Sequence, residues 1–230
     1  MDINPFVVIG ADQRTLVQNH LVAPHIQISY IESDFWDGTY SCTGTVIGLD
    51  TVLTNAHCVF DANMQRGAQS IRVYPAVENG FALRGQYIAE NYFVTSHYIN
   101  TGHASEDFAV IKVGPEINTG LEIGNVGTRP ISTVSNIQGS LIGIHGYPGD
   151  LIRNTFSQWG AFGHVTEETN DLAYYSIDTN SGQSGSSMLR LNSIVGVHNA
   201  SYRFSDGTIV NGGPKVTKRV VDFIRGAQAQ

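Results

Sequence analysis

Basic residues are scarce in this chain of 230 residues, and long hydrophobic runs are absent. Thirteen Lys and Arg face twenty Asp and Glu, which gives a formal net charge of −7. Nucleic acids are bound through clustered positive charge, so we expect no nucleic-acid partner. No apolar run approaches the roughly 20 residues that cross a bilayer, so we expect no membrane partner either.

Cysteine is almost absent, with only Cys42 and Cys58. The sequence leaves open two free thiols or one disulfide, and it favours the disulfide if the protein is secreted. The first six residues, MDINPF, lack the basic and apolar regions of a signal peptide. The chain is therefore expected to be either an intracellular protein or a fragment of a secreted precursor.

Short runs of β-branched and aromatic residues dominate the sequence, and Gly, Asn, Asp and Pro separate them. The clearest predicted strands are 44–49, 51–60, 70–77, 107–113, 140–147, 172–178 and 193–200. No long helical pattern lies between them. This spacing predicts an all-β protein, either an antiparallel sandwich or barrels. A boundary near 125–133 divides the chain into two β halves.

One helix is predicted, in the C-terminal segment PKVTKRVVDFIRGAQ. Val216, Val220, Phe223 and Ile224 recur there at steps of three and four, which places them on one helical face. Pro214 is a suitable residue just before a helix start. We expect this helix to dock on the sheets.

Among eight histidines, His57 is singled out by its surroundings. The motif TNAHC places it at the end of an apolar strand, beside Cys58. A base that is held at a strand end is preorganised for proton transfer. A serine nucleophile needs such a base, and the base needs a carboxylate on its other nitrogen.

The segments GQSGS and SEDFAVIKV supply the two missing groups. Ser184 lies between Gly182 and Gly185, whose backbones reach conformations closed to other residues. Asp107 precedes an apolar strand and can be buried at its head. We predict a catalytic set of His57, Asp107 and Ser184, with the amides of Gly182 and Ser184 as an oxyanion hole. The competing interpretation is a turn, a capped strand and a core histidine.

In their order and spacing, these motifs resemble those of the chymotrypsin-like serine endopeptidases, and most closely the bacterial glutamyl endopeptidases of the bacilli type. The resemblance runs from Val7 to the end of the chain and rests on TNAHC, SEDFAVIK, HGYPGD, SIDTNSGQSGSSML and IVGVHNASY. It implies two six-stranded antiparallel β-barrels with a C-terminal α-helix, and an active site between the barrels. It also implies a Cys42–Cys58 disulfide, secretion, and cleavage of peptide bonds after Glu and less readily after Asp.

The same resemblance assigns the substrate-binding S1 pocket to His198, Thr179 and the amine of Val7. That amine becomes free only when residues 1–6 are removed, so the resemblance implies a zymogen. Gln183 stands where the animal enzymes carry an Asp that pairs with the new N-terminus, so activation should differ here. Phe6 is not an acidic residue, so a separate activating protease is expected.

Asp178 is in conflict with this assignment. It stands six positions before Ser184, where the trypsin branch of the family carries an Asp that receives Lys or Arg. If Glu is the substrate, Asp178 must point away from the pocket or be paired. Two alternatives stay open: the same triad with Lys/Arg specificity through Asp178, and an inactive protease-like binding protein.

We therefore expect residues 1–6 to be a propeptide remnant or residues added by cloning. Residues 7–125 are expected to form an N-terminal barrel with His57 and Asp107, and residues 126–230 a C-terminal barrel with Ser184 and the helix. The expected partners are protein or peptide substrates with an acidic P1 residue, and the protein is expected to be monomeric. No Cys/His spacing fits zinc, so no cofactor and no metal site is expected.

Overall fold

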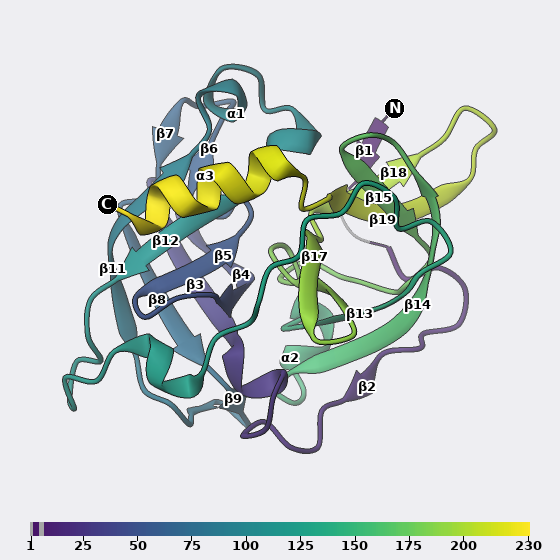
Figure 1. Ribbon diagram of the computed structural model, residues 1–230. Helices are drawn as coiled ribbons and strands as arrows, with labels where there is room; N and C mark the ends of the chain where they lie inside the picture. Colours follow the sequence, from purple (N-terminus) through teal and green to yellow (C-terminus); the bar gives the residue numbers. More distant parts are fainter. Residues whose placement is uncertain (1, 5–6) are drawn as a thin grey trace.

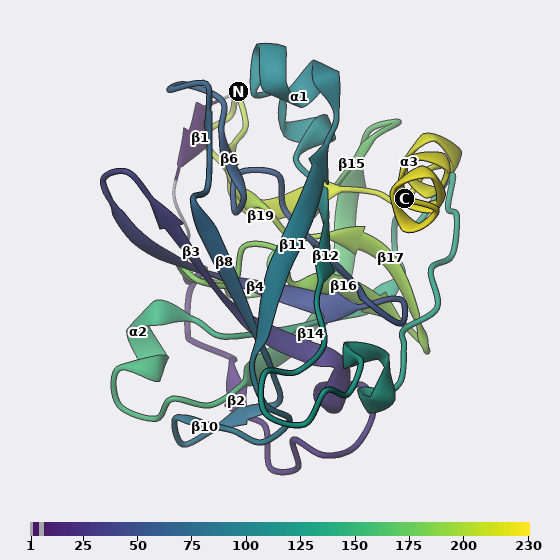
Figure 2. The same ribbon diagram turned by 90° about the vertical axis from the view of Figure 1, so that its left-hand side faces the viewer.

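Two β domains lie side by side in the computed structural model, which describes residues 2–4 and 7–230 (Figure 1). The predicted propeptide remnant, 1–6, falls partly outside the described residues, at positions 1, 5 and 6. Residues 2–4 form a short strand. Figure 2 shows the same arrangement turned by 90°.

The first domain is a closed six-stranded barrel in the order β11-β12-β5-β4-β3-β8. Its strands are β3 (Ile28–Phe35), β4 (Gly38–Val46), β5 (Thr51–Thr54), β8 (Ser70–Pro75), β11 (Tyr87–Val94) and β12 (Ala109–Val113). Antiparallel pairing brings β12 against β5, with Ala109 opposite Thr54. Ile31, Val52 and Ile111 are fully buried in its core. The expectation of a six-stranded barrel is confirmed here.

The second domain is a nine-stranded sheet within the described residues, in the order β1-β18-β19-β15-β14-β13-β16-β17, with β2 added on β14. Its strands are β1 (Asp2–Asn4), β2 (Thr15–Leu16), β13 (Leu141–Gly146), β14 (Trp159–Glu168), β15 (Leu172–Tyr175), β16 (Ser187–Arg190), β17 (Ser193–Val197), β18 (Ala200–Arg203) and β19 (Ile209–Pro214). An isolated bridge from Gly196 to Lys215 joins β17 to the end of β19. The predicted second six-stranded barrel is thus a curved sheet in which the edge strand β17 reaches the end of β19 at one bridge rather than along a ladder.

The N-terminal segment lies on the second sheet, although it precedes the first barrel in the chain. β1 pairs with β18, and β2 pairs with β14. Two small hairpins complete the strands: β6 (Phe60–Asp61) with β7 (Arg66–Gly67), and β9 (Val77–Glu78) with β10 (Phe81–Ala82). The domain boundary at 125 stays a prediction.

The predicted C-terminal helix is present as α3 (Lys218–Gln228), but it begins later than Pro214 suggested. Pro214 instead ends β19, where it stands opposite Leu172. A Pro lacks the amide that an interior strand needs, and a strand end tolerates it. Val220 and Ile224 of α3 pack with Leu53 and Val110 of the first barrel. Figure 1 shows α3 crossing the first barrel next to β12.

Short helices escaped prediction because they have too few turns for a periodic signal. They are α1 (Ser96–Thr101), α2 (Gly149–Ile152) and the 3-10 turns η1 (His25–Gln27), η2 (Ala104–Glu106) and η3 (Ile123–Val126). The turn η2 leads directly into Asp107. No helix among the described residues has the length and apolar character needed to cross a membrane.

Candidate active site

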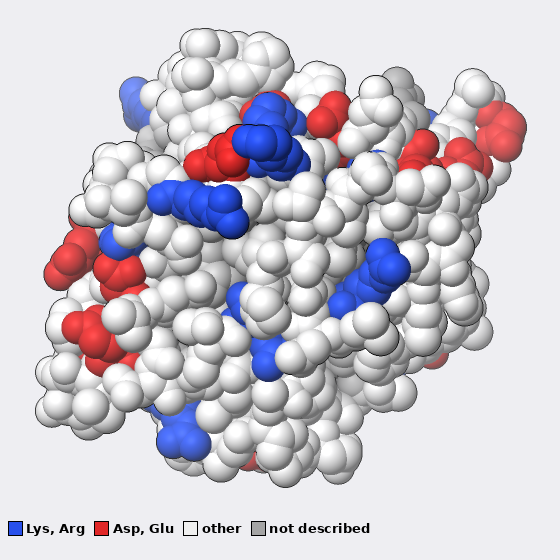
Figure 3. Space-filling view, in the orientation of Figure 1, with Lys and Arg blue, Asp and Glu red and all other residues white. Residues whose placement is uncertain are grey.

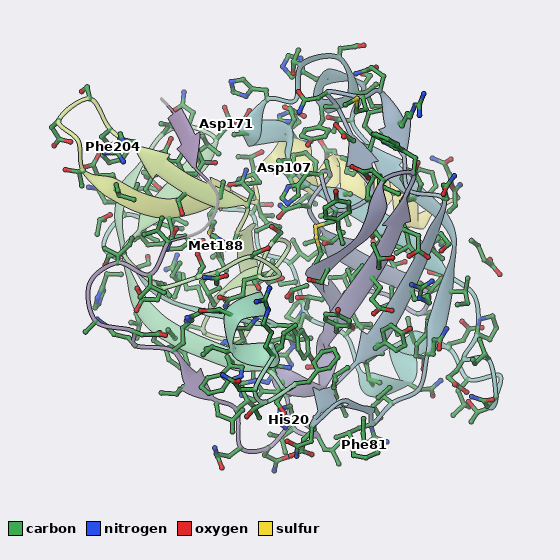
Figure 4. All side chains as sticks on the ribbon, turned by 180° about the vertical axis from the view of Figure 1, so that it is seen from behind. His20, Phe81, Asp107, Asp171, Met188 and Phe204 are labelled. Atoms are coloured by element: carbon green, nitrogen blue, oxygen red, sulfur yellow. A yellow bond between two sulfur atoms is a disulfide. The ribbon has the colours of Figure 1, made fainter. Side chains whose placement is uncertain are left out.

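His57 and Asp107 meet at the rim of the first barrel, each just beyond a strand. β5 ends at Thr54, short of the predicted 51–60, and His57 follows in the turn. β12 begins at Ala109, two residues after Asp107. Since β5 and β12 are paired neighbours, their ends bring both side chains together. Asp107 lies between the two domains in the view from behind (Figure 4).

Asp107 holds His57 through both carboxylate oxygens. Oδ2 lies 2.7 Å from Nδ1 of His57, and Oδ1 accepts the backbone N–H of His57 at 3.0 Å. Burial alone lowers the pKa of His57, but the charge and hydrogen bond of Asp107 outweigh burial and raise that pKa above its ordinary value. The imidazole is therefore oriented, and its protonated form is stabilised.

Asn199 supports the same carboxylate from the second domain, and sequence reasoning did not single it out. Its Nδ2 donates to Oδ2 of Asp107 at 3.2 Å. Tyr202 in turn donates its hydroxyl to Oδ1 of Asn199 at 2.7 Å, which fixes the direction of the amide. Asn199 follows His198 directly in the sequence, but nothing in the sequence distinguishes it from the other Asn residues of the chain.

Ser184 lies in a turn that requires its two flanking glycines. Gly182 has φ +92° and Gly185 has φ +86°, in the region that favours glycine. A Cβ on Gly182 would lie 2.4 Å from the Tyr147 carbonyl oxygen, and one on Gly185 would lie 2.0 Å from that of Thr43. The turn can therefore form only with glycine at both positions.

Thr43 ties this turn to the first barrel. Its N–H donates to the Ser184 carbonyl at 2.7 Å, and its hydroxyl donates to the Gly182 carbonyl at 2.8 Å. Ser184 is thereby held beside the strand β4 that carries Cys42. Both Ser184 and His57 line one cleft of about 440 Å³ between the domains. No hydrogen bond joins these two side chains among the described residues, and such bonds often tighten only when substrate binds.

The backbone N–H groups of residues 182–185 alternate between those that have an acceptor within the protein and those that have none. The N–H of Gln183 donates to the Asn180 carbonyl at 3.0 Å, and that of Gly185 donates to the His198 carbonyl at 2.9 Å. The N–H groups of Gly182 and Ser184 have no acceptor in the part of the chain that the structure describes. These are the two donors that sequence reasoning assigned to an oxyanion hole.

Gln183 serves the turn itself. Its Oε1 accepts the N–H of Asn180 at 3.0 Å, so the side chain closes the loop locally. Its neutral amide offers no ion pair to a chain terminus. The expectation that activation differs from that of the animal enzymes stays a prediction.

The disulfide between Cys42 and Cys58 is confirmed, and it spans 16 positions. It links β4 to the turn of His57, so the base and the nucleophile turn share one anchor. The sulfurs lie close to the His57 ring, in a grouping that resembles a metal-binding set. Because both sulfurs are consumed by the disulfide, they offer no thiolate to a metal.

His198 lies behind the nucleophile turn and is fully buried. Its N–H donates to the Ser186 carbonyl at 2.8 Å, and its Nδ1 lies 2.8 Å from the Tyr175 hydroxyl. Burial lowers the pKa of His198 to about 3, the nearby His57 adds to this, and the Gly212 carbonyl opposes it. The ring is therefore neutral at neutral pH, and Tyr175 is a partner that the sequence did not reveal.

Asp178 is paired, as a Glu-binding pocket requires. Its Oδ1 accepts the N–H of Ile9 at 2.7 Å, and its Oδ2 accepts the N–H of Gln13 at 2.8 Å. The residue is only 2% exposed. Each carboxylate oxygen accepts a backbone amide and the side chain is buried, so Asp178 is committed to the N-terminal segment rather than presented to a cleft. This is the pairing that the expectation of an acidic substrate required of Asp178, and the specificity itself stays a prediction.

Thr179 and Val7 lie close to this pairing. Thr179 is fully buried, and its hydroxyl oxygen has no hydrogen-bond partner within residues 2–4 and 7–230. The carbonyl of Val7 accepts from Nδ2 of Asn211 at 3.0 Å, and the same Nδ2 donates to the Ile177 carbonyl at 2.8 Å. Asn211 thus places Val7 beside the strand that leads into Asp178 and Thr179.

Comparison with protein families matches the chain over residues 17–224 to the family described as Trypsin. A glutamyl endopeptidase of Bacillus licheniformis is 32% identical over 225 residues, which cover 94% of this chain and 67% of that protein. A glutamyl endopeptidase of Staphylococcus aureus is 26% identical, over 84% of this chain and 56% of that protein. The chain thus spans between half and about two thirds of the length of these relatives.

Solved structures similar to this chain are also proteases. A Glu endopeptidase in complex with MPD superposes with a TM-score of 0.88 at 46% identity, over 97% of this chain and 100% of that one. The thermostable serine protease AL20 superposes with a TM-score of 0.77 at 20% identity, over 89% of this chain and 98% of that one. The second likeness shows the fold alone.

Proposed function

The chain belongs to the trypsin family of chymotrypsin-like serine proteases, with glutamyl endopeptidases among its relatives, and we propose that it cleaves peptide bonds after Glu and less readily after Asp. The observation that carries the catalytic part of the proposal is the 2.7 Å contact between Asp107 and His57 in the cleft that also holds Ser184.

Each member of this set has one role. Nε2 of His57 takes the Ser184 hydroxyl proton as Oγ attacks the substrate carbonyl carbon. The amides of Gly182 and Ser184 stabilise the oxyanion that forms. His57 then gives the proton to the leaving amine, and the C–N bond breaks to leave an acyl-enzyme. A water molecule then attacks the acyl carbon while His57 accepts its proton. His57 returns the proton to Oγ as the acyl C–O bond breaks, which releases the carboxylic acid and frees Ser184. Asp107 keeps its charge throughout and stabilises the imidazolium of His57.

Selection of Glu rests on His198 and Thr179. The neutral His198 ring has one N–H, and we assign it to Nε2, with the buried Tyr175 phenol donating to Nδ1 at 2.8 Å. We assign this N–H and the unpaired Thr179 hydroxyl to the P1 carboxylate. A longer Glu side chain reaches these buried groups better than Asp. Binding of the anion raises the pKa of His198 and favours a charge-assisted bond.

Val7 completes the pocket in this proposal. Its position beside Asn211 and the Asp178–Ile9 pairing hold the segment near Thr179. Cleavage before Val7 by a separate protease frees an amine there, so the chain with residues 1–6 is a zymogen. The 7–230 form should show a higher kcat/KM than the 1–230 form, and equal values would contradict this step. The disulfide fits a secreted protein.

Replacement of the nucleophile tests the catalytic assignment. Ser184→Ala in the 7–230 form should lower kcat by roughly 10⁴–10⁶-fold, as loss of a triad serine does elsewhere. Ser181→Ala is the matched control, because Ser181 is an exposed residue of the same turn and should leave kcat unchanged.

A serine-directed organophosphate reagent distinguishes the enzyme from an inactive binding protein. It should label the 7–230 form and the Ser181 variant, but not Ser184→Ala. A folded Ser184→Ala protein that keeps substantial peptidase activity would overturn the assignment. Absence of labelling in the unmutated 7–230 form would instead favour a binding protein.

A further inference from the structure

Arg129 is buried without a carboxylate. It lies in the segment that connects the two domains, and it is 8% exposed. Its Nη1 donates to Oδ1 of Asn192 at 2.6 Å, and its backbone N–H donates to the Val46 carbonyl. Its Nε is buried and has no hydrogen-bond partner among the described residues. A guanidinium carries five donor hydrogens, so most of its binding capacity is unused.

Arg14 shows how this chain satisfies a buried guanidinium. Arg14 is 7% exposed and makes hydrogen bonds to both Asp12 and Asp150. Burial lowers the pKa of Arg14, but these two carboxylates outweigh burial and raise it. For Arg129 burial acts alone and lowers the pKa. A buried charge is normally paired, but no carboxylate among the described residues pairs with Arg129.

A pocket of about 220 Å³ opens beside Arg129, between the connecting segment and α3. Thr128 and Arg129 line one wall, and Arg225 and Gln228 of α3 line the other. Arg225 is exposed and forms no ion pair among the described residues. Two arginines and a threonine thus border a space large enough for a small polyatomic ion, and the rest of the lining is mostly apolar, with Ile47, Pro130, Ile131, Val221 and Ile224.

The surface around this pocket favours an anion. In the face that Figure 3 shows, the centre below α3 carries blue Lys and Arg atoms and no red ones, while red atoms lie beside the blue ones on α3 and toward the margins. This contrasts with the net charge of −7 for the chain. The pocket shares no lining residue with the cleft of Ser184 and His57, so it is a separate site.

We propose that Arg129 and Arg225 form a binding site for a small tetrahedral oxyanion of the phosphate or sulfate class. The guanidinium of Arg129 supplies positive charge and the donor hydrogens that Asn192 does not occupy, and Arg225 contacts the ion from the helix. Ile47 of the first domain also lines the pocket. The bound ion therefore links the first barrel, the connecting segment and α3, and it stabilises their packing. The proposal does not depend on the specificity of the protease.

Thermal unfolding of the 1–230 chain in phosphate, sulfate, chloride and acetate at constant ionic strength tests the site. A ligand that binds only the folded state raises Tm with saturation. Phosphate and sulfate should raise Tm by roughly 3–6 °C at tenfold above Kd for a domain of this size. Chloride and acetate should give no saturable shift. A shift with acetate equal to that with phosphate would show a carboxylate site and overturn the choice of ion.

Arg225→Gln is the decisive variant, because Arg225 is exposed and its loss should not prevent folding. It should weaken phosphate binding by at least about tenfold in calorimetric titration, since one charge-assisted bond is lost. Arg84→Gln is the matched control, an exposed arginine outside the pocket, and it should keep the wild-type Kd. Arg129→Gln should abolish binding if it folds. No saturable phosphate binding by the wild-type chain, or equal loss in the Arg225 and Arg84 variants, would overturn the proposal.

Discussion

Oδ1 of Asp178 accepts the backbone N–H of Ile9 at 2.7 Å, across 169 positions of sequence. Gln13 donates to the other oxygen at 2.8 Å, so the N-terminal segment holds both oxygens of the buried carboxylate. The position from which a trypsin-like pocket would attract Lys or Arg is thus used to anchor the chain that carries Val7. In the proposed function, Asp178 therefore positions the N-terminal segment and does not contact the substrate.

Asp178→Asn should not change the preferred P1 residue. The Asn side chain has the same shape, but an NH2 group, which only donates, replaces one of the two accepting oxygens. One of the two backbone N–H groups therefore loses its acceptor. We expect unfolding free energy to fall by about 1–3 kcal/mol and KM for a Glu peptide to rise, with a smaller effect on kcat. Denaturant titration and steady-state kinetics measure both.

Asp206→Asn is the matched control for this change. Asp206 also accepts a backbone N–H, that of Thr208, but on an exposed turn. Its replacement should leave KM unchanged. If Asp178→Asn abolished a pre-existing cleavage after Lys, the account of this residue would be wrong.

Asn199→Ala should impair catalysis without weakening substrate binding. The change removes a hydrogen bond to Oδ2 of Asp107, the oxygen that faces His57. A less firmly held carboxylate orients the imidazole less well, so we expect kcat to fall about 10- to 100-fold with KM within about twofold, by analogy with other supporting hydrogen bonds. Kinetics at saturating substrate measure this, and circular dichroism checks the fold. An unchanged kcat would show that Asn199 is only structural.

Acid should destabilise the fold through buried histidines. Burial lowers the pKa of His145 to about 4, and the neighbouring His25 adds to the shift. Because the unfolded chain takes up its proton near pH 6.5, the stability from a neutral His145 is present above pH 6.5 and is lost as pH falls from 6.5 to 4. This group contributes up to roughly 3 kcal/mol to the loss.

Substitution of His145 isolates this effect. His145→Leu should flatten the fall of Tm between pH 6.5 and 4, because no proton is taken up at that position. His97→Leu, at an exposed position, should leave the slope as in the wild type. Thermal scans across this pH range measure both, and equal slopes in the wild type and the His145 variant would refute the assignment.

The motifs that carry the predicted catalytic residues are local, and that is why the sequence alone could indicate them. His57 and Asp107 each follow or precede a strand that alternation and β-branched residues reveal, and Ser184 lies between two glycines within four positions. The Trypsin-family match and the Cys42–Cys58 disulfide confirm the resemblance that these motifs carried.

The remaining contacts depend on pairings between distant segments. Nothing near Asp178 indicates that Ile9 and Gln13 fold back onto it, and nothing near His198 indicates Tyr175. Pro214 looked like a helix start because a proline suits both the first turn of a helix and the end of a strand. The closure of the second sheet at a single bridge likewise follows from curvature, which strand patterns do not encode.

A series of peptides that differ only at P1 tests the central claim most directly. The 7–230 form would be assayed with Glu, Asp, Gln and Lys at that position. Because His198 and Thr179 are assigned to a carboxylate, kcat/KM should be highest for Glu, lower for Asp, and at least about 10²-fold lower for the isosteric Gln. Cleavage after Lys should be negligible. Equal rates for Glu and Gln, or a preference for Lys, would contradict the account.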